Sequence, residues 1–432
     1  MLNGIKRTMV SIKNKINIKF IEFLLIILPI ALLFSIVIAE IIVVLIILSY
    51  CLFSNQNDFI KSIKDPILFL LIIFWLYLFI NFFINYENSP SFSRTLFFGR
   101  FILLIISINF LINNLEINIK KIFKYWLLIL IIISFDLFIQ FYTQKNILGF
   151  EAHKLDRDIF RVSGFMNDEL KIANLIYNFG LLAFAYFFFN TQNHSLHKYN
   201  YLLLILIILT IFITAERSHF VSSIFFLIFF ILFGGLNYKK LIVFLSGFLI
   251  LMSIFVYTNK ELSNRMIFEI NDKASILKEK PGKSYLYKDN KYFAHYSVAY
   301  QIFKDNQYFG VGLKNFRKFC NNDKFNKDIF PGWHNRKCST HPHNFYFEII
   351  SEIGGIGLFL ILCFFIFSIL RFLKIFSISR DKFLLFNLFI ILIYFTPFIP
   401  RGSFFNNWNA IIFWIIFSIL YSSYNKLKKI ND

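Results

Sequence analysis

Long apolar runs recur along almost the whole chain of 432 residues, of which 57% are hydrophobic. A run of about 20 apolar residues is long enough to cross the hydrocarbon core of a bilayer as a helix. Lipid offers no partner for backbone amides and carbonyls, so a chain in this environment satisfies them within helices. The sequence therefore predicts an all-α, polytopic membrane protein that contacts the lipid bilayer along most of its length.

The apolar runs predict about twelve membrane spans. They fall near residues 20–36, 38–54, 66–86, 95–113, 122–142, 170–190, 199–214, 218–235, 240–258, 344–370, 383–399 and 404–423. The chain thus divides into a basic tail (1–19), a first group of spans (20–258), a large loop (259–343), and a last group of spans with a C-terminal tail (344–432).

Basic residues give these spans one consistent orientation. Short cytoplasmic loops of membrane proteins are rich in Lys and Arg, whereas long outer loops escape this rule. With the N-terminus inside, the inner connections carry the lysine clusters, among them Lys61 and Lys64, Lys120, Lys121 and Lys124, Lys239 and Lys240, and Lys426, Lys428 and Lys429. We therefore expect both termini in the cytoplasm. We attribute most of the formal charge of +20 to topology, and expect no nucleic-acid partner.

The loop at 259–343 is the one outer segment large enough to fold by itself. Within it, aromatic and apolar residues recur at helical spacing over 292–303, which predicts an amphipathic helix lying on the membrane or on the bundle. Cys320 and Cys338 lie 18 residues apart in the same loop. In an oxidising compartment this pair predicts a disulfide. The alternative is a metal site shared with His334 and His341.

His343 marks the point where the polar loop meets an apolar span. An imidazole at the mouth of a membrane helix is hard to explain by packing, and the ordinary pKa of this group suits a general base. Asn344 can cap the helix that follows, and amides at a helix start favour an anion. His341 either orients its neighbour or is itself the base. A structural hydrogen bond from His343 to a nearby loop is the plainer explanation.

Arginines occupy outer positions in a chain that elsewhere uses mostly Lys. Arg217 and Arg401 lie in short outer turns, Arg265 opens the large loop, and Arg161 precedes the sixth span. Such residues can simply extend to lipid headgroups. A guanidinium, however, binds phosphate oxygens in pairs, which Lys does not. We therefore predict a diphosphate clamp from Arg217, Arg265 and Arg401, with a weaker contribution from Arg161.

Carboxylates supply the remaining candidates. Glu352 lies about two turns into the tenth span, where an unpaired carboxylate is costly, so we expect it to face the bundle and pair with an arginine or orient a catalytic group. Glu169 flanks the outer end of the sixth span. The chain has no nucleotide-binding loop and no strong metal-ligand cluster. We expect no cofactor and no metal, and therefore a donor substrate that carries its own activation.

Four segments of this sequence resemble the O-antigen ligase and O-antigen polymerase superfamily. They are Arg161–Glu169, Glu216–Ser218, Phe309–Phe316, and His343–Gly357 with its Asn344, Glu352 and glycines. The number of spans and the large loop before the last three also match. Gln307 and Tyr308 depart from the family, which often has a His-Pro pair there.

The resemblance implies a metal-independent, inverting glycosyltransferase on the periplasmic face of the bacterial inner membrane. It implies transfer of a glycan from an undecaprenyl-diphosphate donor to an acceptor hydroxyl. Carried over by residue, His343 is the base, and Arg217 and Arg265 hold the diphosphate. Arg401 is added from its position alone.

Three functions remain open. A ligase transfers the finished glycan to lipid A–core, whereas a polymerase extends one lipid-linked glycan with a second. We favour the ligase, although the shared motifs do not separate the two. A transporter of polysaccharide or lipid-linked sugars also fits many spans with buried charges. Transporters place ionisable residues near the midplane and often contain repeated halves, which this sequence does not show.

Overall fold

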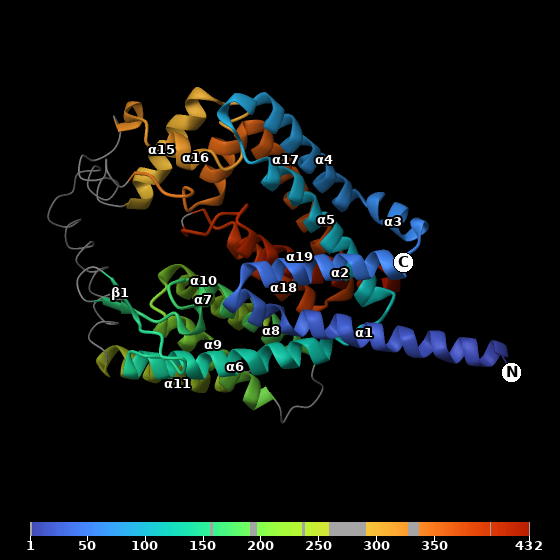
Figure 1. The fold of residues 1–432 in the computed structure, drawn as a ribbon. Coiled ribbons are helices and arrows are strands. Elements are labelled where there is room, and N and C mark those ends of the chain that lie inside the picture. The colour runs from blue at the N-terminus through green and yellow to red at the C-terminus, as the bar shows by residue number, and fades with distance from the viewer. Residues whose placement is uncertain are drawn as a thin grey trace.

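The computed structural model describes residues 2–155, 159–190, 197–235, 238–258, 291–326, 337–397 and 399–431. Within these ranges the chain forms a bundle of helices (Figure 1). The helices are α1 (Leu2–Phe34), α2 (Ile36–Phe53), α3 (Gln56–Ile63), α4 (Pro66–Ile84), α5 (Phe92–Asn113), α6 (Ile119–Thr143), α7 (Ile172–Leu175), α8 (Leu181–Asn190), α9 (His197–Ile213), α10 (Arg217–Phe233), α11 (Tyr238–Thr258), α15 (Lys291–Asp305), α16 (Phe316–Phe319), α17 (Phe345–Ser379), α18 (Lys382–Tyr394) and α19 (Asn407–Asn431). A π-helical segment, Ile176–Gly180, joins α7 to α8.

Seven described segments are long and apolar enough to cross a membrane: α2, α4, α5, α6, the α7–α8 segment, α17 and α19. Shorter apolar helices lie at Tyr199–Ile213, Arg217–Phe233, Ser246–Thr258 and Lys382–Tyr394. All of them fall on predicted spans. The prediction of a helical, polytopic membrane protein is therefore confirmed, whereas the count of about twelve stays a prediction.

The predicted basic tail over residues 1–19 is helical. Helix α1 begins at Leu2 and continues into the first apolar run. This segment contains Lys, Arg, Ile and Met, which tolerate a helix, and its first proline is Pro29. The break before α2 falls at Ser35, whose side chain caps the next helix.

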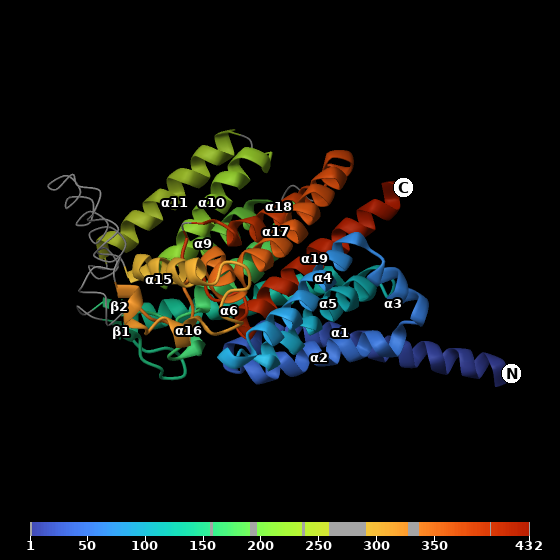
Figure 2. The same ribbon diagram turned by 90° about the horizontal axis from the view of Figure 1, so that it is seen from above.

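Helix α19 forms the centre of the bundle. Its residues from Trp408 to Ser422 are buried, and it packs against α5, α17, α18 and α2. Figure 2 shows α19 running through the middle of the assembly toward the C-terminus. Both termini lie at one end of the bundle, whereas β1 and α15 lie toward the other end (Figure 1). The helices therefore hold the loops discussed below away from both termini.

A small hairpin is the exception to the predicted all-α fold. Strands β1 (His153–Leu155) and β2 (Ile159–Arg161) pair antiparallel, with His153 opposite Arg161. They lie in the outer segment between α6 and α7. Each strand has three residues, too short for the periodicity that predicts a strand from sequence.

Two buried polar side chains of α6 hold this segment in place. Asp136 accepts a hydrogen bond from the Ile147 amide (2.9 Å). Gln140 accepts from the amides of Ser163 (3.0 Å) and Gly164 (2.7 Å). These intramembrane polar residues therefore anchor a loop, and they place Arg161 at the end of the bundle.

Helix α15 covers the residues over which an amphipathic helix is predicted in the large loop, and it lies on the bundle against α17. Its buried side chains form a small core of their own with the segment that follows. This core contains Ala294, Val298, Ala299, Ile302, Val311, Phe316, Cys320 and Phe325. Cys320 and Cys338 are joined in a disulfide, with their Cα atoms 5.3 Å apart.

Helix α17 is interrupted at Gly354, whose φ of 72° no helix contains. The interruption releases backbone carbonyls of the preceding turn, and neighbouring segments satisfy them. The amides of Val311 and Gly312 donate to the carbonyls of Ser351 (3.0 Å) and Glu352 (2.8 Å). The Tyr77 hydroxyl donates to the carbonyl of Ile353 (2.6 Å). The loop before α16 is thus hydrogen-bonded into the broken helix.

Glycine is required at this junction. A Cβ on Gly354 would lie 2.2 Å from the Tyr308 carbonyl oxygen, and one on Gly310 would lie 2.6 Å from the backbone of Glu352. Both residues also have a positive φ, which side chains rarely adopt. The glycine-rich sequence of α17 therefore allows both the bend and the close approach that its sequence suggested.

We expect Gly354→Ala to destabilise the protein by about 2 kcal/mol or more, because it combines an unfavourable φ with a backbone clash. Gly247→Ala in α11 is the matched control, since a Cβ added at that position would have no atom within 4 Å. That change should be neutral or slightly stabilising. Thermal unfolding in detergent measures both. Equal unfolding midpoints for the two variants would contradict the docking described here.

Candidate functional site

Three connections meet at the end of the bundle away from the termini: the α9–α10 turn, the loop before α17, and the α18–α19 connection. The Arg401 amide donates a hydrogen bond to the His343 carbonyl (2.8 Å). The Arg401 side chain donates from a terminal nitrogen to Ser222 Oγ in α10 (2.6 Å) and to the Ile393 carbonyl in α18 (3.0 Å). Arg401 therefore links all three connections.

His343 lies at this junction in an unusual backbone conformation. Its φ is 60°, which is uncommon for a residue with a side chain and is often found at functional sites. Its Nε2 shares a hydrogen bond with Ser339 Oγ (3.0 Å). The ring centroids of Tyr292, His295 and His341 lie 5.4, 5.5 and 4.2 Å from the centroid of the His343 ring. The imidazole thus lies among aromatic rings.

His341 is a weaker candidate for the base. Its Nδ1 accepts from Thr340 Oγ1 (2.9 Å), and its Nε2 lies 3.3 Å from the Arg401 carbonyl, so both ring nitrogens have partners. Burial, with a contribution from the nearby Lys314 cation, lowers the pKa of His341 to about 4. Such a ring is neutral at neutral pH and holds a proton poorly, so the geometry favours His343.

Charged side chains collect around the α9–α10 turn. Glu216 lies 2.9 Å from His219 Nδ1. Burial opposes ionisation of Glu216, but His219, Arg161 and Arg401 together hold its pKa below the usual range. Burial lowers the pKa of Arg161, which interacts electrostatically with Glu216, Tyr292 and Arg217. The predicted Arg161, Arg217 and Arg401 are thus brought into one neighbourhood. Arg265 lies outside the described residues.

Arg401 is almost completely buried, with 6% of its surface exposed. Burial lowers the pKa of its guanidinium, and the tyrosines and Glu216 around it oppose this effect. Its Nε, like the Nε of Arg161, has no hydrogen-bond acceptor among the described residues. Buried donors without acceptors are costly, and a bound anion would satisfy them.

The start of α17 differs from what we expected. The Asn344 side chain accepts from the amides of Tyr346 (2.9 Å) and Phe347 (3.3 Å), so the predicted cap is formed. The Asn344 amide group donates to the Pro397 carbonyl (2.5 Å). Because the cap already satisfies these two backbone amides, they are occupied and do not offer an anion site.

Glu352 is buried, as predicted, but its partner is not an arginine. Its carboxylate accepts from the backbone amide of Lys314 (2.8 Å). The Lys314 ammonium lies 3.6 Å from Glu348 and donates to Ser403 Oγ. Glu348 in turn accepts from Ser403 Oγ and from the Phe404 amide (2.8 Å). This buried network fixes the α18–α19 connection on α17.

Sequence reasoning missed both Lys314 and Glu348. Glu348 lies in the first turn of α17, one turn before Glu352, so the two carboxylates share a helix face. A second intramembrane carboxylate at this spacing was the signal that a cation had to lie nearby.

Glu169 lies at the rim of this region. Its side chain is exposed and pairs with Lys171. The Lys171 ammonium lies 5.8 Å from the centre of the Trp408 ring, and its charge acts on His341. Glu169 therefore acts on the histidines only through its neighbour.

No group of three or more His, Cys, Asp or Glu side chains that could hold a metal occurs among the described residues. The sulfur atoms of Cys320 and Cys338 are bonded to each other. His334, the other predicted ligand of a metal alternative, lies outside the described residues.

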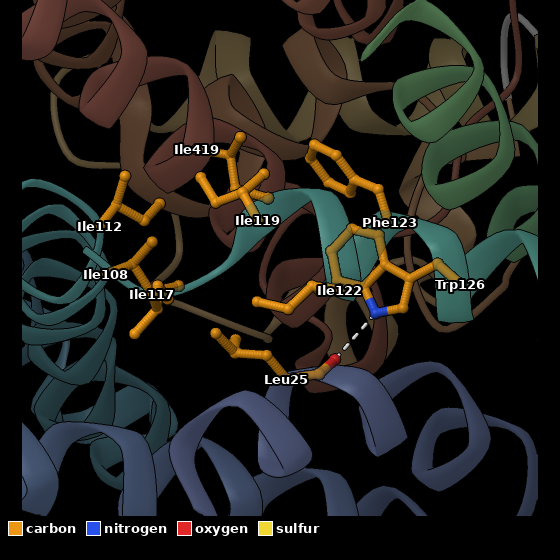
Figure 3. A pocket seen from close by; sticks show the side chains of 9 residues that line it. All are labelled: Leu25, Ile108, Ile112, Ile117, Ile119, Ile122, Phe123, Trp126 and Ile419. Atoms are coloured by element: carbon orange, nitrogen blue, oxygen red, sulfur yellow. Dashed lines mark hydrogen bonds between the residues drawn. The ribbon is translucent and has the colours of Figure 1, made fainter. Parts of the chain in front are cut away.

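A separate apolar pocket lies between α1, α5, α6 and α19 (Figure 3). Its empty volume of about 280 Å³ includes space that is open to the outside, so the closed part is smaller. Its lining consists of Leu25, Ile108, Ile112, Ile117, Ile119, Ile122, Phe123, Trp126 and Ile419. The Trp126 indole donates to the Leu25 carbonyl (2.8 Å). A lining of this kind offers nothing to a sugar or a phosphate, so this pocket does not compete with the site above.

We expect Lys314→Met to destabilise the protein by about 3–5 kcal/mol, because it leaves Glu348 and Glu352 buried without a cation. Adding Glu348→Gln should recover part of that loss. Lys324→Met is the control, since Lys324 forms an exposed pair with Asp305 and should change stability by less than about 1 kcal/mol. Thermal unfolding in detergent tests this series. A Lys314→Met variant as stable as the control would disprove the network's importance.

The low pKa of His341 predicts acid sensitivity. An unfolded histidine binds a proton below about pH 6.5, whereas folded His341 resists protonation down to about pH 4. The contribution of neutral His341 to the free energy of unfolding is therefore fully present above pH 6.5. It is lost as pH falls toward 4. The total loss is at most about 3 kcal/mol. His341→Asn should flatten the fall in unfolding temperature between about pH 7 and 5. An unchanged slope would contradict the burial of the neutral ring.

Residues 202–362 match the model of a family described as O-antigen ligase. The matched segment contains Arg217, Lys314, His343 and Glu352, and it covers less than half of the chain. No curated protein matches the sequence. The family match confirms the resemblance to the O-antigen ligase and polymerase superfamily. The apolar helices indicate a multi-pass membrane protein, and the match supports a function of the O-antigen ligase or polymerase type.

Proposed function

We propose that this protein is an O-antigen ligase-type glycosyltransferase in lipopolysaccharide or surface-polysaccharide biosynthesis. It transfers a glycan from an undecaprenyl-diphosphate donor to a hydroxyl of lipid A–core, on the periplasmic face of the bacterial inner membrane. One observation carries this proposal: His343 and the buried Arg401 are joined by a backbone hydrogen bond of 2.8 Å, and Arg161 and Arg217 lie in the same charged neighbourhood. A proton acceptor and an anion site are the two parts that this reaction needs.

His343 acts as the base. It takes the proton from the acceptor hydroxyl as that oxygen forms its bond to the anomeric carbon of the donor sugar. The contact with Ser339 and the neighbouring rings keep the imidazole in one orientation. A positioned base of this kind typically contributes a factor of about 10² to 10⁴ in rate.

The arginines receive the leaving group. The bond between the anomeric carbon and the diphosphate oxygen breaks on the face opposite the incoming hydroxyl, which inverts the configuration. Charge then grows on the diphosphate, and Arg217 with Arg161 stabilises it through paired hydrogen bonds in a site of low dielectric. The positive charge comes from fixed guanidinium groups, so we propose a mechanism without a metal.

Arg401 has a different role from the one its sequence position suggested. Its terminal nitrogen is bound to Ser222 and Ile393, so it contributes positive charge from beneath the site. Its backbone holds His343, and its buried Nε remains available to a polar partner. A residue in this place sets the distance between the base and the anion, on which proximity catalysis depends.

Ligase and polymerase share this chemistry and differ in the acceptor, so the acceptor separates them. The decisive experiment reconstitutes the purified protein in liposomes with an undecaprenyl-diphosphate glycan and supplies one of two acceptors. Glycan on lipid A–core supports the ligase, and a longer lipid-linked glycan identifies a polymerase. Movement of the lipid-linked glycan without either product identifies a transporter.

In the same assay, His343→Ala should lower transfer by at least about 10²-fold, because the acceptor hydroxyl loses its base. His153→Ala, in the hairpin at the same end of the bundle, is the matched control and should transfer at the wild-type rate. Both variants should insert and unfold like the wild type. Full transfer by His343→Ala would remove His343 from the mechanism.

A further inference from the structure

A carboxylate–histidine pair in the α9–α10 turn has no part in the mechanism above. Glu216 Oε1 lies 2.9 Å from His219 Nδ1, and only 16% and 8% of the two side chains is exposed. Ser218 Oγ lies 3.4 Å from the same nitrogen. With Nδ1–H donated to the carboxylate, Nε2 is the ring nitrogen that can meet a ligand. The pair therefore has the geometry of an imidazole that a buried carboxylate holds in one orientation.

The His219 ring faces the arginine neighbourhood rather than lipid. His219 and Ser222 are three residues apart in α10, so they share one face of that helix. Ser222 accepts the hydrogen bond from the Arg401 guanidinium (2.6 Å). On its other side, the Tyr177 ring lies 6.1 Å from the imidazole, and Tyr177 also interacts with Arg401. The pair therefore lies close to Arg401, with Ser222 and Tyr177 as shared neighbours.

Unsatisfied buried atoms point to a ligand in this space. Glu216 Oε2, Arg161 Nε and Arg401 Nε are each buried without a hydrogen-bond partner among the described residues. Arg401 is more than nine-tenths buried, so water does not compensate its Nε. Both nitrogens are donors beside a single carboxylate, a balance that fits an anion with several acceptor oxygens.

We propose that His219, positioned by Glu216, is a further diphosphate-binding residue, whose Nε2–H donates to a phosphate oxygen beside Arg161 and Arg401. This inference rests on the proposed function, which supplies the diphosphate. His219 keeps its proton throughout: the hydroxyl proton goes to His343, and the leaving diphosphate gains a hydrogen bond. Glu216 does not touch the substrate; it holds the imidazole in the orientation that presents Nε2.

Glu216 and Tyr177 contact the ring, and Arg161 from β2 and Arg401 from the α18–α19 connection act on Glu216. Arg217 adjoins them at the start of α10.

The test measures binding of undecaprenyl diphosphate, without glycan or acceptor, to the purified protein in detergent. His219→Leu should weaken binding roughly tenfold or more, because a charged hydrogen bond is lost. His219→Gln should bind with intermediate affinity, since an amide still donates a hydrogen bond but carries no charge. Glu216→Gln should bind the lipid with an affinity similar to that of His219→Gln. His153→Gln, in β1, should match the wild type.

The outcomes distinguish failure of the His219 proposal from failure of the proposed function. If the wild type binds the lipid and His219→Leu binds it equally well, the role of His219 is disproved while the proposed function stands. If the wild type binds no undecaprenyl diphosphate and transfers no glycan, the proposed function fails. In transfer assays, His219→Gln should raise KM for the donor and leave KM for the acceptor unchanged. Equal changes in the two KM values, together with a lower unfolding temperature, would show that the Glu216–His219 pair has a purely structural role.

Discussion

The site depends on how one loop is hydrogen-bonded into a broken membrane helix. Gly354 interrupts α17, and the amides of Val311 and Gly312 take up the carbonyls that the interruption releases. This docking buries the Lys314 ammonium against Glu348 and Ser403. Isolated buried charges are expensive, whereas paired and hydrogen-bonded charges are tolerated. The polar network therefore commits the loop to one position on the bundle.

The α18–α19 connection links the docked loop to the candidate site. Ser403 and the Phe404 amide bind Glu348, and two residues earlier the Arg401 amide binds the His343 carbonyl. Arg401 also reaches α10 through Ser222, one turn after His219. The base, the arginines and the Glu216–His219 pair thus come from separate parts of the chain but share one hydrogen-bonded frame, as catalysis by preorganised charges requires.

Apolar periodicity predicted the helical, polytopic fold, because a bilayer leaves a chain few alternatives. Residue chemistry also predicted that Arg161, Arg217 and Arg401 lie at one end with His343, and that Glu352 faces inward. It failed where the answer depended on contacts far apart in sequence. Glu352 binds the Lys314 amide rather than an arginine, and Asn344 occupies the amides expected for an anion. Which buried groups pair is decided by three-dimensional packing, and no local pattern records it.

The central claim is that the charged space around Arg161, Arg217, Arg401 and His219 receives the diphosphate of a lipid-linked donor beside His343. An electron cryo-microscopy structure with undecaprenyl diphosphate bound tests it most directly. We predict phosphate density within hydrogen-bond distance of Arg217 and Arg161, at the end of the bundle opposite the termini, with the lipid tail leading into the membrane. Phosphate density at the cytoplasmic end, or within the apolar pocket beside α6, would contradict this account.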